Sequence, residues 1–449
     1  MHATPQFESF EGRLLLSAVL AAGQTEVVEL ANGSQAVLKN TGDSAIEYDP
    51  TGPDGLEVNL LADGGQFQTN TWARIGDTDP ADDFLLGRSV LGKGLCYAGT
   101  YYAPIVGPSA FQAGSVDELI VRSGDLASGW VTEGDVDALK LCGGDLYDLF
   151  AVGSVSHLQV GGAVRGSVAI DGDVDCLCAG EITAPATISI TGRLEHLTAG
   201  RLTGGADDYG YAGLYVDGGV GTICAGELTG GVNSTLDIGV TGGIGALHAG
   251  QISGGQAVDG GYASLNLSVT GDVGSLAAWS VVGGTGTGLA EMYVFVGSHW
   301  GDDGSLLAAG DIGHFYAGEL MGGNVSGDGE AAFRMFVEND LAQTRIGRVV
   351  GSGIRRAAAD PAVEIFVGHD IGTFCANVIS GGRAVGPEAL SYVQIQAGHD
   401  IHMLRAWQIT GGRTADDGFA FVDISAEHDI HRFESYSIRG SGRRWGACD

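Results

Sequence analysis

The chain has 449 residues, of which 78 are glycine and 44% are hydrophobic, and its formal net charge is −33, from 22 basic and 55 acidic residues. The hydrophobic share excludes a disordered glycine-rich linker, because such linkers bury too little apolar surface to fold. The acidic balance excludes nucleic acid as a partner, and the chain contains no run of 18 apolar residues that would predict a membrane span.

The first segment, residues 1–23, contains the short apolar stretch LLLSAVLAA, which ends in small residues. Such a stretch is typical of a secretory hydrophobic region. A buried strand or helix at the start of the fold is the alternative, and the flanking glutamates favour it. The sequence ESFEGRLLLSA, residues 8–18, is similar to the ELLEPRLLLSA-type segment of planctomycete extracellular and surface proteins, with Phe10 and Gly12 in place of Leu and Pro. The resemblance implies export or surface sorting and no particular activity.

Residues 24–112 are predicted to form a small N-terminal β cap. The stretches EVVELANGSQAVLKNTGDSAIEY and LEVNLLADGGQFQTNTWARI have the composition of antiparallel strands, with turns at Asn-Gly and Gly-Asp. A repeat array needs such a cap, because its first strand otherwise exposes an unpaired edge.

Residues 113–440 contain a repeat defined by an anchor residue, which follows a recurring Gly or His and precedes an aliphatic residue. The anchors are Ser115, Asp135, Ser154, Asp173, Arg193, Gly219, Gly243, Asp272, Asp311, Asp340, Asp370, Asp400 and Asp429. Aliphatic or aromatic residues recur one and four positions after the anchor, and a small residue, mostly alanine, recurs six positions after it. Further apolar residues recur three, five and seven positions before it. This alternation predicts strands with one buried face.

The repeat length predicts the fold. Three short strands in about 20 residues leave too little chain for a propeller blade or a helical repeat, so each repeat is one coil of a parallel β-helix. We expect an all-β protein with a parallel β-helix (β-solenoid) of about 13 coils, followed by a tail at 441–449. The third strand is expected in segments such as GELTGG and WQITGG, where the glycine pair closes a corner.

Insertions lengthen the later repeats at one place, after the glycine pair. They include residues 206–213, 256–263, 324–331, 383–390 and 413–420. Loops inserted at one corner emerge on one side of a solenoid, so they predict an acidic and aromatic fringe for a partner. Solvated decoration is the alternative.

A soft-metal site is one hypothesis for the repeat Asp173-to-Arg193 and its neighbours. Cys176 and Cys178 occupy outward positions, with His157 one coil before and His196 one coil after. Two thiolates and two imidazoles on one face suit Zn²⁺ or Cu⁺. Because adjacent outward side chains do not necessarily converge, ordinary surface residues are the alternative.

The least regular coil contains SHWGDDGSLLAAG, residues 298–310. Its His299, Trp300, Asp302 and Asp303 are our candidate for a sugar site, because an aromatic floor with carboxylates suits a sugar. Loose aspartate pairs such as Asp416 and Asp417 are candidates for weak Ca²⁺ binding, although their spacing does not match a calcium-binding nonapeptide.

A last cluster is formed by the dipeptides His369-Asp370, His399-Asp400 and His428-Asp429, with His402 and His431 nearby. Stacked on consecutive coils, they would chelate a cation or form a pH-sensitive corner. The structural alternative is that each aspartate caps its local turn.

These patterns predict a non-catalytic protein that is extracellular or located at the cell surface. Its predicted role is structural, adhesive, or the binding of a polysaccharide or another surface protein. A polysaccharide lyase or glycoside hydrolase on a β-helix scaffold is the alternative. Its catalytic carboxylates cannot be identified from the sequence, because acidic residues are too frequent here to mark a catalytic pair. The sequence assigns no catalytic residue and no cofactor beyond the Ca²⁺, Zn²⁺ and Cu⁺ candidates.

Overall fold

The structure is a computed structural model that describes residues 18–30, 33, 35–40, 45–52, 55–60, 65–69, 73–76, 85–91, 112–113, 115–121, 130–132 and 134–443, the last range without 207–209, 298–309, 326–328, 356–361, 386–388, 416–417 and 441. In these residues every regular element is a β-strand, and none is a helix that could cross a membrane. The chain divides into two compact units, residues 1–162 and 163–449.

The first unit combines antiparallel and parallel pairing. β2 and β3 form an antiparallel hairpin around Gly33, whose φ of 77° suits glycine, and β4 pairs antiparallel with β1 and β5. Parallel pairing joins β5 to β7 and connects the series β6–β8–β10–β12–β14. The strands are β1 (Ala18–Leu20), β2 (Thr25–Glu29), β3 (Gln35–Asn40), β4 (Ile46–Gly52), β5 (Gly55–Leu60), β6 (Gly65–Thr69), β7 (Ala73–Gly76), β8 (Leu85–Leu91), β9 (Gln112–Ala113), β10 (Ser115–Val121), β11 (Trp130–Thr132), β12 (Val136–Leu141), β13 (Leu149–Ala151) and β14 (Val155–Val164).

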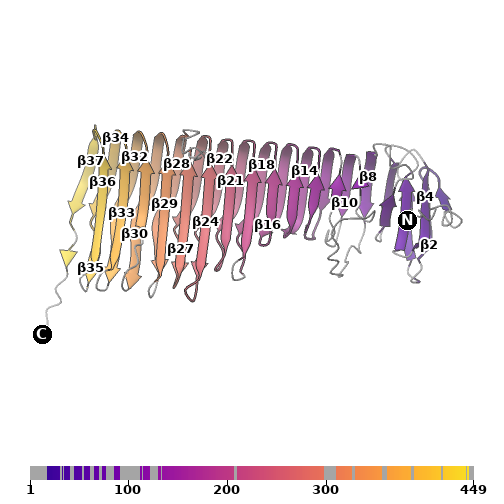
Figure 1. Cartoon of the computed structure of the whole chain (residues 1–449), viewed down its shortest axis with the longest axis horizontal. Coiled ribbons are helices and arrows are strands. Elements are labelled where there is room, and N and C mark those ends of the chain that lie inside the picture. The colour runs from indigo at the N-terminus through magenta and orange to yellow at the C-terminus, as the bar shows by residue number, and fades with distance from the viewer. Residues whose placement is uncertain are drawn as a thin grey trace, which may run out of the picture. The chain divides into compact units, whose positions relative to one another are not determined.

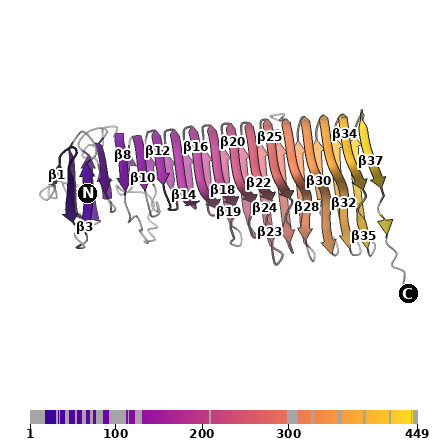
Figure 2. The same ribbon diagram turned by 180° about the vertical axis from the view of Figure 1, so that it is seen from behind.

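The second unit is a parallel β-helix, as the repeat predicts. Its chain passes alternately through two parallel sheets, which Figure 1 and Figure 2 show from opposite sides. Sheet one contains β16 (Val174–Thr183), β18 (Leu194–Thr203), β20 (Val220–Thr229), β22 (Ile244–Ser253), β25 (Val273–Val282), β28 (Ile312–Val325), β30 (Leu341–Arg355), β32 (Ile371–Val385), β34 (Ile401–Thr410) and β37 (Phe433–Arg439). Sheet two contains β15 (Ser167–Ile170), β17 (Thr187–Ile190), β19 (Tyr211–Val216), β21 (Thr235–Val240), β24 (Tyr262–Val269), β27 (Leu289–Val296), β29 (Glu330–Val337), β31 (Ala362–Val367), β33 (Leu390–Ala397) and β36 (Phe419–Ala426).

The core of this unit lies between the two sheets, and the predicted inward columns are confirmed. The residues four positions after the anchor pair in register from Leu177 through Leu197, Ile223 and Leu247, and each is at most 1% exposed. The residues three, five and seven positions before the anchor are at most 2% exposed for the anchors from Arg193 to Asp272 and from Asp340 to Asp400, and they are half-buried before the last anchor, Asp429. Aromatic side chains join the sheets farther along, where the rings of Phe315 and Phe333 stack 6.4 Å apart.

Glycine pairs close the corner after sheet one for two reasons that act together. At Gly254-Gly255, a Cβ on the first glycine would lie 1.7 Å from the carbonyl oxygen of Gly283, and the second glycine has a φ of +96°. A side chain is therefore excluded at the first position by the next coil and disfavoured at the second by the backbone conformation.

The third strand was predicted in the wrong place. Segments such as GELT and WQIT continue the strands of sheet one, within β20 and β34, and do not form a separate strand. Sheet three lies after the glycine pair, in part of the predicted insertions, and contains β23 (Gln256–Ala257), β26 (Thr285–Gly286), the ends of β28, β30 and β32, β35 (Arg413–Ala415) and β38 (Gly442–Arg443). The insertions therefore extend the coil itself, and small alanine clusters such as Ala384, Ala389 and Ala420 fill their core.

Candidate functional site

A groove of about 1450 Å³ crosses sheet one of the second unit, from Thr198 in β18 to Tyr436 in β37. It is lined by the residues five, six and seven positions after the anchor on consecutive strands. The sixth position supplies a floor of small side chains, namely Ala199, Ala225, Ala249, Ala278, Ala317, Ala376 and Ala406, interrupted by Ile346. Ala225, Ala249 and Ala278 are half-buried and the other four alanines are at most 7% exposed, so the floor offers an elongated ligand only a little side-chain surface.

Large aromatic side chains stand at the seventh position at two places along this floor, in its middle and near its last strand. Trp279 in β25 is 81% exposed, and Trp407 in β34 is 63% exposed. The ring of Tyr436 in β37 continues the second platform, stacked 4.5 Å from Trp407 with an interplanar angle of 8°. Between the two tryptophans, the same position holds only small or medium side chains, Gly318, Gly347 and Asn377. Four strand steps separate the tryptophans, which is about 19 Å at the usual spacing.

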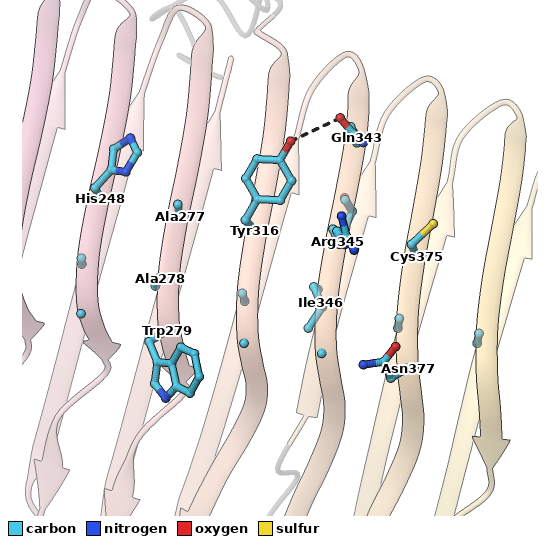
Figure 3. Close-up of a pocket in the computed structure, with 18 of the residues that line it drawn as sticks. His248, Ala277, Ala278, Trp279, Tyr316, Gln343, Arg345, Ile346, Cys375 and Asn377 are labelled. Atoms are coloured by element: carbon cyan, nitrogen blue, oxygen red, sulfur yellow. Dashed lines mark hydrogen bonds between the residues drawn. The ribbon is translucent and has the colours of Figure 1, made fainter.

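Polar groups occupy the fifth position between these platforms. Tyr316, Arg345 and Cys375 lie side by side on β28, β30 and β32 (Figure 3). The Tyr316 hydroxyl donates a hydrogen bond to Gln343 Oε1 at 3.3 Å. Arg345 is exposed and, among the described residues, has no ion-pair partner.

The groove differs in charge from the rest of the chain. Its described lining contains two arginines, Arg345 and Arg405, and a single carboxylate, Glu434, so its formal charge is +1 against −33 for the whole chain. Arg405 lies 3.4 Å from Glu434, whereas Arg345 is left for a ligand.

This groove was not predicted from the sequence, although a signal was present. We assigned the alanine column to the core, but several of its members are also accessible from outside. Trp279 and Trp407 both lie seven positions after an anchor aspartate, and that shared offset was sufficient to place them in one file.

The aspartate ladder occupies the opposite end of the strands of sheet one, at the corner before each strand. Each anchor aspartate before the last, Asp429, accepts a hydrogen bond from the backbone N–H of the anchor residue in the next coil, so it holds the following turn and not its own. These bonds measure 2.7–3.0 Å in the pairs Asp173–Arg193, Asp272–Asp311, Asp311–Asp340, Asp340–Asp370, Asp370–Asp400 and Asp400–Asp429.

Among the residues that the structure describes, histidines join this ladder only in its last coils. His369 Nδ1 lies 2.9 Å from Asp340 Oδ1, and His399 Nδ1 lies 2.9 Å from Asp370 Oδ1. The rings of His369 and His399 stack 4.9 Å apart. The side-chain hydrogen bond to Asp340 raises the pKa of His369. The histidine file predicted from the spacing is therefore present in the structure.

A second file of histidines flanks the same aspartates. His431 Nε2 lies 3.1 Å from Asp400 Oδ2, His402 Nε2 lies 3.5 Å from Asp370 Oδ2, and the two imidazole rings stack 5.2 Å apart. The backbone N–H of Asp429, followed by the His431 side chain, holds the pKa of Asp400 below its usual range. The carboxylate of Asp400 is therefore charged and flanked by imidazoles.

The four residues of the predicted soft-metal site are brought together only in part. Cys176 and Cys178 lie on one face of β16 with their Sγ atoms 3.3 Å apart, and His196 pairs in register with Cys176. Burial, followed by the neighbouring Cys178 thiol, raises the pKa of Cys176 to about 11, which disfavours the thiolate that binds metals. His157 belongs to the first unit. The site stays a prediction, since no group of three clustered ligands in the described residues includes this pair.

The predicted sugar site and calcium pair lie outside the described residues. These residues are His299, Trp300, Asp302, Asp303, Asp416 and Asp417. They too stay predictions.

A charged network covers part of sheet two. Arg334 in β29 forms ion pairs with Glu291, with Glu330 at 3.1 Å and with Glu364 at 2.9 Å, and only 19% of its side chain is exposed. Burial and the adjacent Glu291 raise the pKa of Tyr293 to about 12. Because each of these carboxylates is engaged by Arg334, the network links neighbouring strands and leaves no free acid–base pair.

Comparisons of the chain with protein-family models, curated proteins and solved structures found no match.

Proposed function

We propose that the protein binds an acidic polysaccharide chain along the groove of sheet one, outside the cell and without cleaving it. The observation that carries this proposal is the pair Trp279 and Trp407, exposed at the same strand position with a floor of small side chains between them. Exposed indole rings in a groove are typical of a binding surface, because their flat apolar faces stack on the flat faces of sugar rings.

Charge supports an acidic ligand. A polyanion is repelled by a chain of net charge −33, so it needs a local positive group to bind. The guanidinium of Arg345 supplies that group between the two aromatic platforms, and its planar donors match a carboxylate or a sulfate. The amide side chains of Gln343 and Asn377 are placed beside it for hydroxyl groups.

The lining favours binding over hydrolysis. A glycosidase needs two carboxyl groups flanking the scissile bond. The described part of the groove contributes Glu434 alone, and that carboxylate already contacts Arg405. The extracellular location is supported by the resemblance of residues 8–18 to the segment of planctomycete surface proteins.

The proposal is tested by titrating the full chain with alginate, polygalacturonate and chondroitin sulfate, next to neutral xylan, in an isothermal calorimeter. We expect binding to at least one acidic polymer and none to xylan. Trp279→Ala, Trp407→Ala and Arg345→Gln should each weaken binding about tenfold or more, as central interface residues do.

Two matched controls lie outside the groove. Phe419→Ala removes an exposed aromatic ring from sheet two, and Arg348→Gln removes an arginine of β30 that pairs with Glu319 at 3.0 Å. Both should leave the affinity unchanged. Equal affinity of the groove variants and the controls would refute the site, and shortened polymer products after incubation would establish an enzyme instead.

A further inference from the structure

We infer that Asp400, His402 and His431 form a binding site for a divalent transition-metal ion of the zinc type, at the corner of the last coils. One carboxylate oxygen and two imidazole nitrogens of these residues lie within 4.8 Å of one another. Imidazole and carboxylate together suit Zn²⁺ and Ni²⁺. This site is independent of the groove and of the polysaccharide proposed for it.

The histidines are not required by the fold. The histidines of the last coils stand one position before and two positions after an anchor, as His399 and His402 do around Asp400. Asp173 and Asp272 hold the next turn by the same backbone hydrogen bond, although no histidine occupies either position around the anchor that follows them. At Asp311 the neighbouring side chain is Asn339, whose amide donates to the carboxylate at 2.6 Å. A neutral amide therefore fulfils the structural role that a histidine fills in later coils.

Five of the eleven histidines of the chain are concentrated at this one corner, between His369 and His431. The concentration is local, because the aspartate ladder itself extends much farther along the sheet. A feature that the fold uses in many coils has thus acquired metal-binding side chains in only a few.

The distances fit a small ion. Donor atoms around a tetrahedral zinc lie about 3.3 Å apart, given metal–ligand bonds of about 2.0–2.1 Å. The Oδ2 atom of Asp400 lies 3.1 Å from Nε2 of His431. A ring nitrogen of His402 lies within 4.8 Å of the ligand atoms of both residues, so a modest rotation of its side chain would complete the set. The Oδ1 atom of Asp400 is occupied by the backbone N–H of Asp429, so Oδ2 remains for the ion while the turn stays held.

The ion would join two coils. Asp400 and His402 belong to one coil and His431 to the next, which contains β37. Because a metal bound to the native state alone stabilises that state, metal binding should protect this terminal coil from local unfolding.

The test uses the full chain without a histidine tag, treated with EDTA and dialysed. ZnCl₂ and NiCl₂ are titrated into it by calorimetry, and hydrogen exchange of β34 and β37 is followed by mass spectrometry with and without ZnCl₂. The double variant His402→Gln/His431→Gln is compared with His248→Gln, an exposed histidine outside every clustered group. Asp400→Asn is compared with Asp311→Asn, because asparagine keeps an acceptor for the backbone N–H in both.

We expect the wild type to bind one of the two metals, with slower exchange in β34 and β37. The double variant should lose at least about a hundredfold in metal affinity, because mutating even a residue that only supports a metal ligand lowers the affinity tenfold or more. Asp400→Asn should bind the metal more weakly than the wild type. Both controls should bind it as the wild type does. The inference is overturned if neither metal binds, if the double variant binds as tightly as His248→Gln, or if binding is lost in Cys176→Ser instead. Circular dichroism of each variant checks that it is folded.

Discussion

Thr344 interrupts the buried column of sheet one, and replacing it with valine should stabilise the protein. It pairs in register with Phe315 on one side and Phe374 on the other, and its side chain is fully buried. Its Oγ1 is a buried side-chain polar atom with no hydrogen-bond partner in the part of the chain that the structure describes. The hydroxyl has therefore lost its water without gaining a protein partner.

The magnitude follows from that loss. A buried hydroxyl without a partner costs about 1–3 kcal/mol. Thr344→Val exchanges it for a methyl group of similar size and keeps the β-branched shape, so rotamer and strand preferences change little. We expect the free energy of unfolding to rise by about 1–2 kcal/mol. Thr344→Ser keeps the hydroxyl and loses the methyl group, so it should instead lower the stability by about 1 kcal/mol.

Equilibrium unfolding in guanidinium chloride measures the change, with hydrogen exchange of β30 as a local readout. The denaturant slope should be the same in wild type and variant, because the surface exposed on unfolding is nearly unchanged. Thr373→Val, a half-buried threonine on the neighbouring strand, is the control and should stay within about 0.5 kcal/mol of the wild type. A Thr344→Val protein that is less stable than the wild type would refute the reasoning.

Three further predictions concern charged and titratable groups. Arg334→Met removes the guanidinium that three glutamates share and should lower the free energy of unfolding by about 3 kcal/mol, measured in guanidinium chloride at pH 7. No change in that free energy would show that the ion pairs contribute nothing. Burial, followed by the Cys178 thiol, raises the pKa of Cys176 to about 11. Iodoacetamide at pH 8 should therefore label Cys176 on the order of a hundredfold more slowly in the folded protein than in the unfolded chain. Equal labelling rates by mass spectrometry would contradict this. The pKa of His369 is raised by Asp340, and Asp370 and His399 also face the ring. The stabilisation that protonated His369 gives to the folded state is therefore complete below a pH of about 6.5 and is lost as the pH rises through the folded-state pKa. In EDTA, His369→Gln should therefore destabilise the protein more at pH 5.5 than at pH 8.5, and the reverse order would exclude the ion pair.

The β-helix was predictable because its physical cause repeats along the chain. Leu177, Leu197 and Ile223 share one offset from their anchors, and a parallel sheet converts that shared offset into direct contact. The third strand was misplaced for the complementary reason. The apolar Ile and Leu of WQIT and GELT fit a separate strand as well as the continuation of one, and local alternation does not show where a corner lies.

The candidate sites were predictable to the extent that register alone determines contact. The stacking of His369 and His399 follows from their spacing of 30 residues. Convergence of Cys176 and Cys178 with His196 does not follow, because outward side chains on adjacent strands are parallel and their reach depends on rotamers. The groove was missed because an alanine column has two explanations, a thin core or an open floor, and only the fold distinguishes them.

Because the strands of sheet one pair in parallel and in register, distances along the groove are whole numbers of strand steps. Trp279 and Trp407 are separated by whole strand steps, so an insertion or deletion that preserves the sheet moves one tryptophan relative to the other by a full coil or not at all. Excision of one coil, such as residues 341–370, would shorten the interval by one step and bring the platforms to a new, equally rigid separation. The length of the surface proposed to bind a polysaccharide would therefore change in discrete increments.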